Sequence, residues 1–127
     1  MCIRDSSWNK LGAEGAKALA SMLEVNAVLT NLNLASNYLT DFGADMTGVI
    51  ALTEALKVNT VLTDLNLASN NLTDGGLDMT GIAALAKALK VNAALKKCDL
   101  SYNNMGSGAE AALREAVKGK NGFELLM

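Results

Sequence analysis

The feature that most constrains this chain is a pattern that it repeats. The segment Leu62-Thr-Asp-Leu-Asn-Leu-Ala-Ser-Asn70-Asn-Leu72 reads L-x-x-L-x-L-x-x-N-x-L. The same pattern begins 33 residues earlier at Leu29 and 33 residues later at Leu95, where Cys98 and Met105 replace two of the leucines. Three copies in register indicate a repeat architecture in which each copy is one supersecondary unit.

Each copy predicts a strand followed by a turn. Leucines two residues apart, such as Leu65 and Leu67, lie on one face of a strand. Stacked copies therefore form a parallel sheet with an apolar inner face and a polar outer face. The asparagine stands where the chain leaves the strand, so its side chain can bond backbone groups of its own turn and the next. We predict a structural ladder of Asn37, Asn70 and Asn103, because an unpaired buried backbone group costs about 1–3 kcal/mol.

A helix is predicted after each turn. Gly15, Leu19 and Leu23 are four residues apart in a segment rich in Ala, Leu, Lys and Glu, which favour helix. The same spacing recurs in two later sets: Gly48, Leu52, Leu56 and Gly81, Leu85, Leu89. Each repeat is therefore a strand, a turn and a helix packed behind the sheet, and the fold class is α/β.

The two central repeats contain an insertion of five residues, at 42–46 and 75–79, before the helix. Thr47 and Thr80 follow the insertions and are predicted helix N-caps. Four aspartates lie within the insertions or directly before them: Asp41, Asp45, Asp74 and Asp78. Oxygen-rich clusters can bind calcium, but this spacing matches no calcium loop, and turn and capping roles account for the aspartates. No metal site is therefore predicted.

Composition excludes several classes of function. The 127 residues include no histidine, which removes Ser-His and Cys-His nucleophile pairs and histidine metal ligands. The net charge of −2 contains no run of like charges, so we expect no nucleic-acid or membrane partner. Two cysteines, Cys2 and Cys98, are too few for a disulfide scaffold and favour a cytoplasmic protein. We expect no catalytic residue, cofactor or small-molecule substrate.

The first six residues do not fit the repeat. Counting back from the next copy places Arg4 where Leu32 stands, and a charged residue cannot supply the buried strand face. Residues 1–6 also match the translation of a common transposon-end sequencing adapter. We interpret them as a cloning scar, with a genuine capping segment as the alternative. The rest would then be the C-terminal part of a longer protein.

The domain at residues 7–127 divides by the repeat spacing. We predict a partial repeat at 7–28, full repeats at 29–61, 62–94 and 95–122, and a terminal strand or cap at 123–127. In this last segment Phe123 and Leu126 align with Leu29 and Leu32. A strand there would cover the end of the stack, as terminal repeats must.

One segment carries a specific resemblance. Asn9-Lys-Leu-Gly-Ala-Glu-Gly-Ala-Lys-Ala-Leu-Ala20 resembles the N-x-L-G-x-x-G-x-x-x-L-A stretch of ribonuclease-inhibitor-type leucine-rich repeats. That subclass includes ribonuclease inhibitor, the repeat domains of NOD-like receptors and the Ran GTPase-activating proteins. The resemblance implies a right-handed horseshoe with parallel strands on the concave side and helices on the convex side. The five-residue insertions depart from it. Ankyrin repeats share the period of 33, but this chain lacks the proline and histidine of their turn.

Two polar rows cross the predicted concave face and are the candidate partner-binding site. They are Asn31–Asp64–Lys97 and Asn33–Asn66–Asp99. Neighbouring strands lie about 4.8 Å apart, so each row offers closely spaced polar groups, either to a partner or to solvent. We predict a non-enzymatic protein–protein interaction scaffold. The alternatives are a regulator of an enzyme such as a small GTPase, and a capping fragment with no activity alone.

Overall fold

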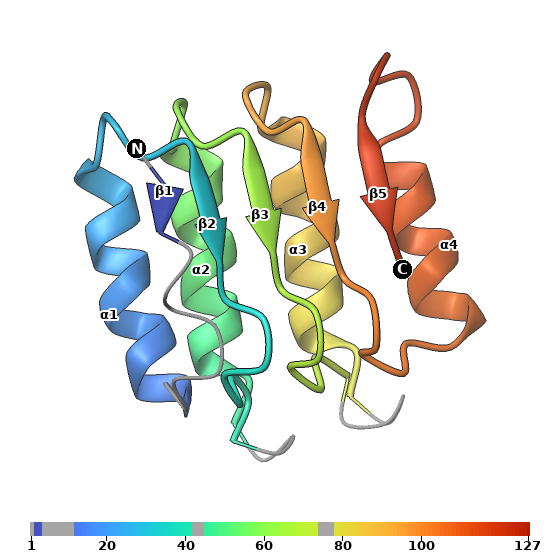
Figure 1. Cartoon of the computed structure of the whole chain (residues 1–127). Helices are drawn as coiled ribbons and strands as arrows, with labels where there is room; N and C mark the ends of the chain where they lie inside the picture. Colours follow the sequence, from blue (N-terminus) through green and yellow to red (C-terminus); the bar gives the residue numbers. More distant parts are fainter. Residues whose placement is uncertain (1, 4–11, 42–44, 74–77) are drawn as a thin grey trace.

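The computed structural model describes residues 2–3, 12–41, 45–73 and 78–127. Within these residues, five parallel strands form one sheet in chain order, and the helices that alternate with them cover one face (Figure 1). The elements are β1 (Cys2–Ile3), α1 (Gly12–Val25), β2 (Asn31–Asn33), α2 (Thr47–Val58), β3 (Asp64–Asn66), α3 (Thr80–Val91), β4 (Lys97–Asp99), α4 (Ser107–Ala116) and β5 (Glu124–Leu126). The predicted alternation of helices and parallel strands is confirmed. No helix in this part of the chain is long and apolar enough to cross a membrane.

The three central strands pair in the register that a 33-residue repeat predicts. Leu32, Leu65 and Cys98 lie side by side across β2, β3 and β4, and all three side chains are buried. The residues that flank them in each strand are half-buried. Burial raises the pKa of the Cys98 thiol to about 12. This cysteine therefore acts as a small hydrophobic residue in a leucine position.

The first strand, β1, pairs one residue away from the predicted register. The repeat spacing aligns Arg4 with Leu32, but the residue paired with Leu32 is Ile3. Ile3 rather than Arg4 therefore takes the register position beside Leu32. The origin of residues 1–6 as a cloning scar stays a prediction, and residues 4–6 lie outside the described part of the chain.

The last strand, β5, also differs from the predicted register by one residue. Leu125 rather than Leu126 pairs with Cys98, and Leu125 packs partly buried against the core. Both candidates are leucines, so the apolar pattern alone does not choose between them. Backbone pairing sets the register, because the N–H of Glu124 donates to the carbonyl of Lys96 at 2.9 Å.

The predicted glycine and leucine positions are all buried in α2 and α3. In α1, Leu23 is buried, whereas Gly15 and Leu19 are half-buried. The core face of α1 consists mainly of alanines, because α2 approaches it closely at Gly48. A Cβ atom on Gly48 would lie 2.6 Å from the carbonyl oxygen of Ala13, so only glycine permits this approach.

Buried asparagine side chains bond each turn to the next. The Oδ1 atom of Asn70 accepts hydrogen bonds from the backbone N–H groups of Asn37 at 2.9 Å and Leu39 at 3.3 Å. Its Nδ2 atom donates to the carbonyl of Leu34 at 2.9 Å. Asn103 makes the corresponding bonds to the turn that contains Asn70. Because these three asparagines are at most 2% exposed, water cannot replace the bonds.

The helices α2 and α3 begin differently from the prediction. Thr47 and Thr80 are their first residues rather than their caps. The aspartate two residues earlier accepts from the threonine N–H, at 2.9 Å for Asp45 and 3.0 Å for Asp78, and also from the threonine hydroxyl. The hydroxyl bond first, and then the N–H bond, lower the pKa of each carboxyl group.

We expect Asn70→Ala to destabilise the protein by about 3 kcal/mol or more. The substitution leaves two buried N–H groups and a carbonyl unpaired, at about 1–3 kcal/mol each. Urea unfolding followed by circular dichroism measures the change. Asn31→Ala is the control, since its side chain makes no hydrogen bond within the described residues, and should change stability by less than about 0.5 kcal/mol. Equal unfolding midpoints for the two variants would contradict the structural role of Asn70.

We expect part of the acid sensitivity of the fold to come from Asp45 and Asp78. Their folded-state pKa lies below the ordinary value of about 3.9, so their contribution is complete above that pH and is lost as pH falls through the folded pKa. Replacing both with asparagine keeps an acceptor but removes the titration. The double variant should melt below the wild type at pH 7, and this difference should shrink at a second pH well below the ordinary value of about 3.9. A difference in melting temperature that is the same at both pH values would contradict this prediction.

Candidate functional site

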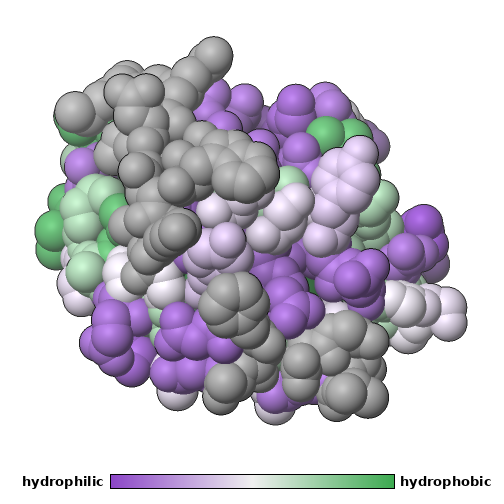
Figure 2. Space-filling view, turned by 60° about the horizontal axis from the view of Figure 1, so that its bottom comes forward, coloured by the Kyte–Doolittle hydropathy of each residue, from purple (hydrophilic) through white to green (hydrophobic). Residues whose placement is uncertain are grey.

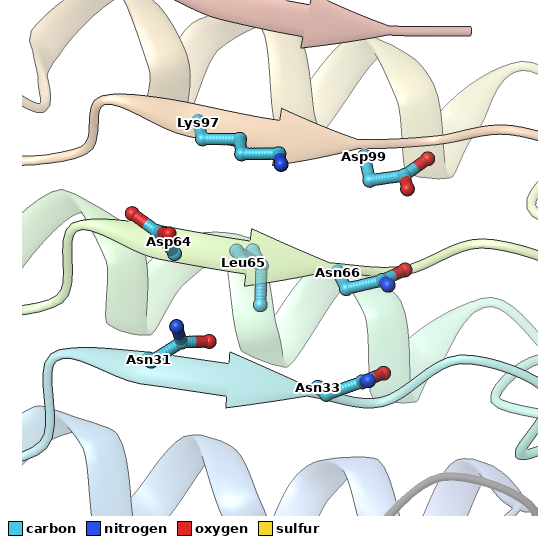
Figure 3. Close-up of a pocket in the computed structure, with 7 residues that line it drawn as sticks. All are labelled: Asn31, Asn33, Asp64, Leu65, Asn66, Lys97 and Asp99. Carbon is cyan, nitrogen blue, oxygen red and sulfur yellow. The ribbon is translucent and has the colours of Figure 1, made fainter. Parts of the chain in front are cut away.

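The face of the sheet opposite the helices carries two rows of polar side chains, and we call it the open face (Figure 3). Row one, at the first position of each central strand, is Asn31, Asp64 and Lys97; row two, at the third position, is Asn33, Asn66 and Asp99. Together with Leu65, these residues line a hollow of about 260 Å³. The structure thus brings together all six residues that the sequence analysis selects for partner binding.

Row two has a structural function in the turns. The Oδ1 atom of Asn33 accepts from the N–H group two residues later at 3.0 Å, and Asn66 and Asp99 form the same bond at 2.9 Å. Such bonds let a side chain close a turn in place of backbone. One oxygen of each residue is therefore occupied by the fold, while the amide nitrogens and the second Asp99 oxygen form no hydrogen bond within the described residues.

Row one has no such function. The side chains of Asn31 and Asp64 form no hydrogen bond or ion pair within the described part of the chain. The Nζ atom of Lys97 lies 3.7 Å from an Oε atom of Glu124. Both partners of this ion pair are substantially exposed, at 42% and 58%, so solvent screening leaves it weak. All three side chains of row one can thus bind another molecule at little cost to the stability of the fold.

The chemistry of the open face is that of recognition. Asp64 and Asp99 present carboxylates, Lys97 presents an ammonium group, and the asparagines present amides that both donate and accept. The described residues contain no group of three or more His, Cys, Asp or Glu arranged to hold a metal ion. The face therefore provides hydrogen bonds and charges of both signs.

The aspartates near the two insertions bond to helix starts. Asp41 accepts from the N–H of Ala13 at 3.2 Å, at the beginning of α1 in the preceding repeat. Asp45 and Asp78 hold the first residues of α2 and α3, as described above. Asp74 and most of each insertion lie outside the described residues. Asp41, Asp45 and Asp78 thus each have a role in local structure.

A second row of asparagines was not selected by the sequence analysis. Asn59 and Asn92 are 4% exposed, and each accepts two N–H bonds from the turn before the next strand. Their Nδ2 atoms donate to the helix of the preceding repeat, at 2.8 Å to the carbonyl of Leu23 and 2.6 Å to that of Leu56. The sequence could have indicated this row, because the pair Val-Asn recurs at a spacing of 33 residues. In the last repeat Lys120 takes this place, and its Nζ atom donates to the Asn92 carbonyl at 3.0 Å.

Comparison with known protein families supports the repeat assignment. A family model described as Leucine Rich repeat matches residues 7–20 and residues 58–79. The second match includes β3 and the turn that contains Asn70. No curated protein matches the chain. The matches, with the alternating helices and parallel strands of one open sheet, support a leucine-rich repeat protein with an α/β solenoid fold. Leucine-rich repeats generally mediate protein–protein interaction, and proteins built from them are typically not enzymes.

We expect Asn66→Ala to destabilise the protein by about 1 kcal/mol, because it removes the acceptor for the N–H of Ala68, a buried residue. Asn66→Asp should cost much less, since Asp99 closes the same turn one repeat later. Chemical denaturation of both variants measures the difference. If alanine and aspartate at this position were equally stable, the oxygen of Asn66 would have no role in the turn.

Proposed function

We propose that this protein is a non-enzymatic interaction scaffold whose open face binds a protein partner. The observation that carries the proposal is the contrast between the two polar rows. In row two, one side-chain oxygen of each residue accepts a hydrogen bond from a turn. In row one, the three polar side chains have no structural role. Half-buried polar groups without a structural function are suited to form hydrogen bonds with another molecule.

We place the protein in the ribonuclease-inhibitor-like subclass, with the open face as the concave side of a right-handed horseshoe. The segment from Asn9 to Ala20 supports the subclass through its asparagine, glycines and leucines. Solenoids of stacked repeats present extended concave surfaces to their partners. Row one and row two would then run along the inside of the curve.

The charges of the open face favour a protein over a nucleic acid. Binding to a phosphate backbone requires clustered positive charge, whereas this face alternates Asp64, Lys97 and Asp99. Protein interfaces combine charges of both signs with amide hydrogen bonds and derive specificity from their arrangement. A partner with a complementary row of basic, acidic and amide groups fits this face.

The test is a triple variant that removes row one, Asn31→Ala with Asp64→Ala and Lys97→Ala. Because these side chains do not support the fold, the variant should keep its melting temperature. The immobilised wild-type chain is used to capture partners from an extract of its own cells, and mass spectrometry quantifies them. A partner that uses the open face should be depleted at least about tenfold with the triple variant.

Glu24→Ala combined with Lys87→Ala is the matched control. Both side chains are exposed on helices and form no ion pair within the described residues, and the change also removes one acidic and one basic charge. The control should capture the partner as the wild type does. A partner retained equally by all three proteins would refute binding at the open face.

A further inference from the structure

Both polar rows of the open face continue into the last strand. Glu124 of β5 pairs in the sheet with Lys97, and Leu126 pairs with Asp99. Extended row one is therefore Asn31, Asp64, Lys97 and Glu124, and extended row two is Asn33, Asn66, Asp99 and Leu126. None of these side chains is buried, so all of them are accessible to another molecule.

The charges of extended row one complement the same row read in reverse. From β2 to β5 the row consists of an amide, a carboxylate, an ammonium group and a carboxylate. In a second copy related by a two-fold axis parallel to the strands, with the two open faces opposed, each row faces its own copy in reversed order. When this axis lies between β3 and β4, Asp64 faces Lys97 of the second copy and Lys97 faces Asp64. At both ends Asn31 faces Glu124.

Extended row two is compatible with the same arrangement. It places Asn66 opposite Asp99 of the second copy. The turn occupies one oxygen of each residue, so Asn66 presents its Nδ2 donor and Asp99 presents its second oxygen as an acceptor. At the ends of the row Asn33 faces Leu126, which brings no charge. Donors thus face acceptors along the centre of both rows.

Other alignments of the two faces are less complementary. A shift of the axis onto β3 opposes Asp64 to its own copy, and a shift onto β4 opposes Lys97 to its own copy and Asp64 to Glu124. A shift by a whole strand takes Asp64 away from Lys97. An axis parallel to the rows leaves Asp64 facing Asn66, without a cation. Because like charges and unpaired charges exclude wrong arrangements, the pattern selects one alignment.

We infer that the open face binds a second copy of this chain, in a symmetric dimer that pairs Asp64 of each copy with Lys97 of the other. The inference rests on the proposed function and names the partner. Stacked sheets lie about 10 Å apart, which a lysine and an aspartate side chain span together. The curvature of a solenoid accumulates from repeat to repeat, so it is small over β2 to β5.

This dimer is held by charges and amides rather than by apolar contact. The open face carries little apolar surface, and Figure 2 shows that hydrophilic residues also dominate the described surface at the edge of the sheet where the strands end. Ion pairs between partly exposed side chains are individually weak and are screened by salt. The association is therefore weak and sensitive to ionic strength.

Sedimentation equilibrium of the purified chain, at concentrations from about 10 µM to about 1 mM, measures the association. We expect a monomer–dimer equilibrium with Kd on the order of 0.1 mM at low salt, because the face is smaller than a standard interface. Raising the salt concentration to about 0.5 M should weaken the dimer at least about fivefold.

Two charge-reversal variants test the pairing itself. Asp64→Lys leaves two cations and no anion at the two central positions of row one, and Lys97→Asp leaves two anions and no cation. Each variant alone should stay monomeric while keeping the melting temperature of the wild type. An equimolar mixture of the two should dimerise with a Kd within about threefold of the wild-type value, because every central cation then faces an anion.

Glu24→Lys and Lys87→Asp are the matched controls, since they make the same changes of charge on the helices. Each should dimerise as the wild type does. A wild-type chain that is monomeric at about 1 mM and low salt, a mixture that does not dimerise, or a dimer that the row-one reversals leave intact would overturn the inference. Capture of a different protein through row one would still support the proposed function, so the two can fail separately.

Discussion

The whole stack depends on one physical constraint, which is that the turns between strands and helices bury polar backbone groups. Asparagine meets this constraint because a short side chain carries both an acceptor oxygen and two N–H donors. Asn70 uses the oxygen for one turn and the amide nitrogen for a carbonyl of the preceding copy. At the opposite end of the strands, Asn59 and Asn92 use the oxygen for their own turn and the amide nitrogen for a carbonyl of the preceding helix. Two rows of asparagine therefore fix the spacing of the copies, one row at each end of the strands. The aliphatic core fills the space between the two rows.

The central part of the fold could be predicted from the sequence because its pattern is redundant. The row of Leu32, Leu65 and Cys98 follows from leucine spacing and from the position of the asparagine, and both give the same register. The end strands lack this redundancy. At Leu125 two leucines are adjacent, and at Ile3 no asparagine follows at the repeat distance. In these two end strands, hydrogen bonding to the neighbouring strand sets the register. The spacing of the residues does not predict it.

The residues of the open face could also be predicted, but which of them bond to the turns could not. Asn31 and Asn33 are the same residue type on the same face of one strand, two positions apart. Only Asn33 lies next to a turn whose N–H group reaches its oxygen. The burial of Asn59 has the same kind of origin, because the helix of the preceding repeat supplies the carbonyl group. Such roles come from neighbours in the stack, which a local pattern does not contain.

A repeat protein also provides its own internal controls, because equivalent positions share almost the same backbone. A departure from the repeat that the structure explains is a structural adaptation. Lys120 replaces an asparagine and still donates to the Asn92 carbonyl, so its cause lies within the fold. The departure at Tyr102 has the opposite character, since it puts a bulky side chain at positive φ and leaves it exposed. Neither the backbone of the turn nor the burial of the side chain accounts for a tyrosine at this position.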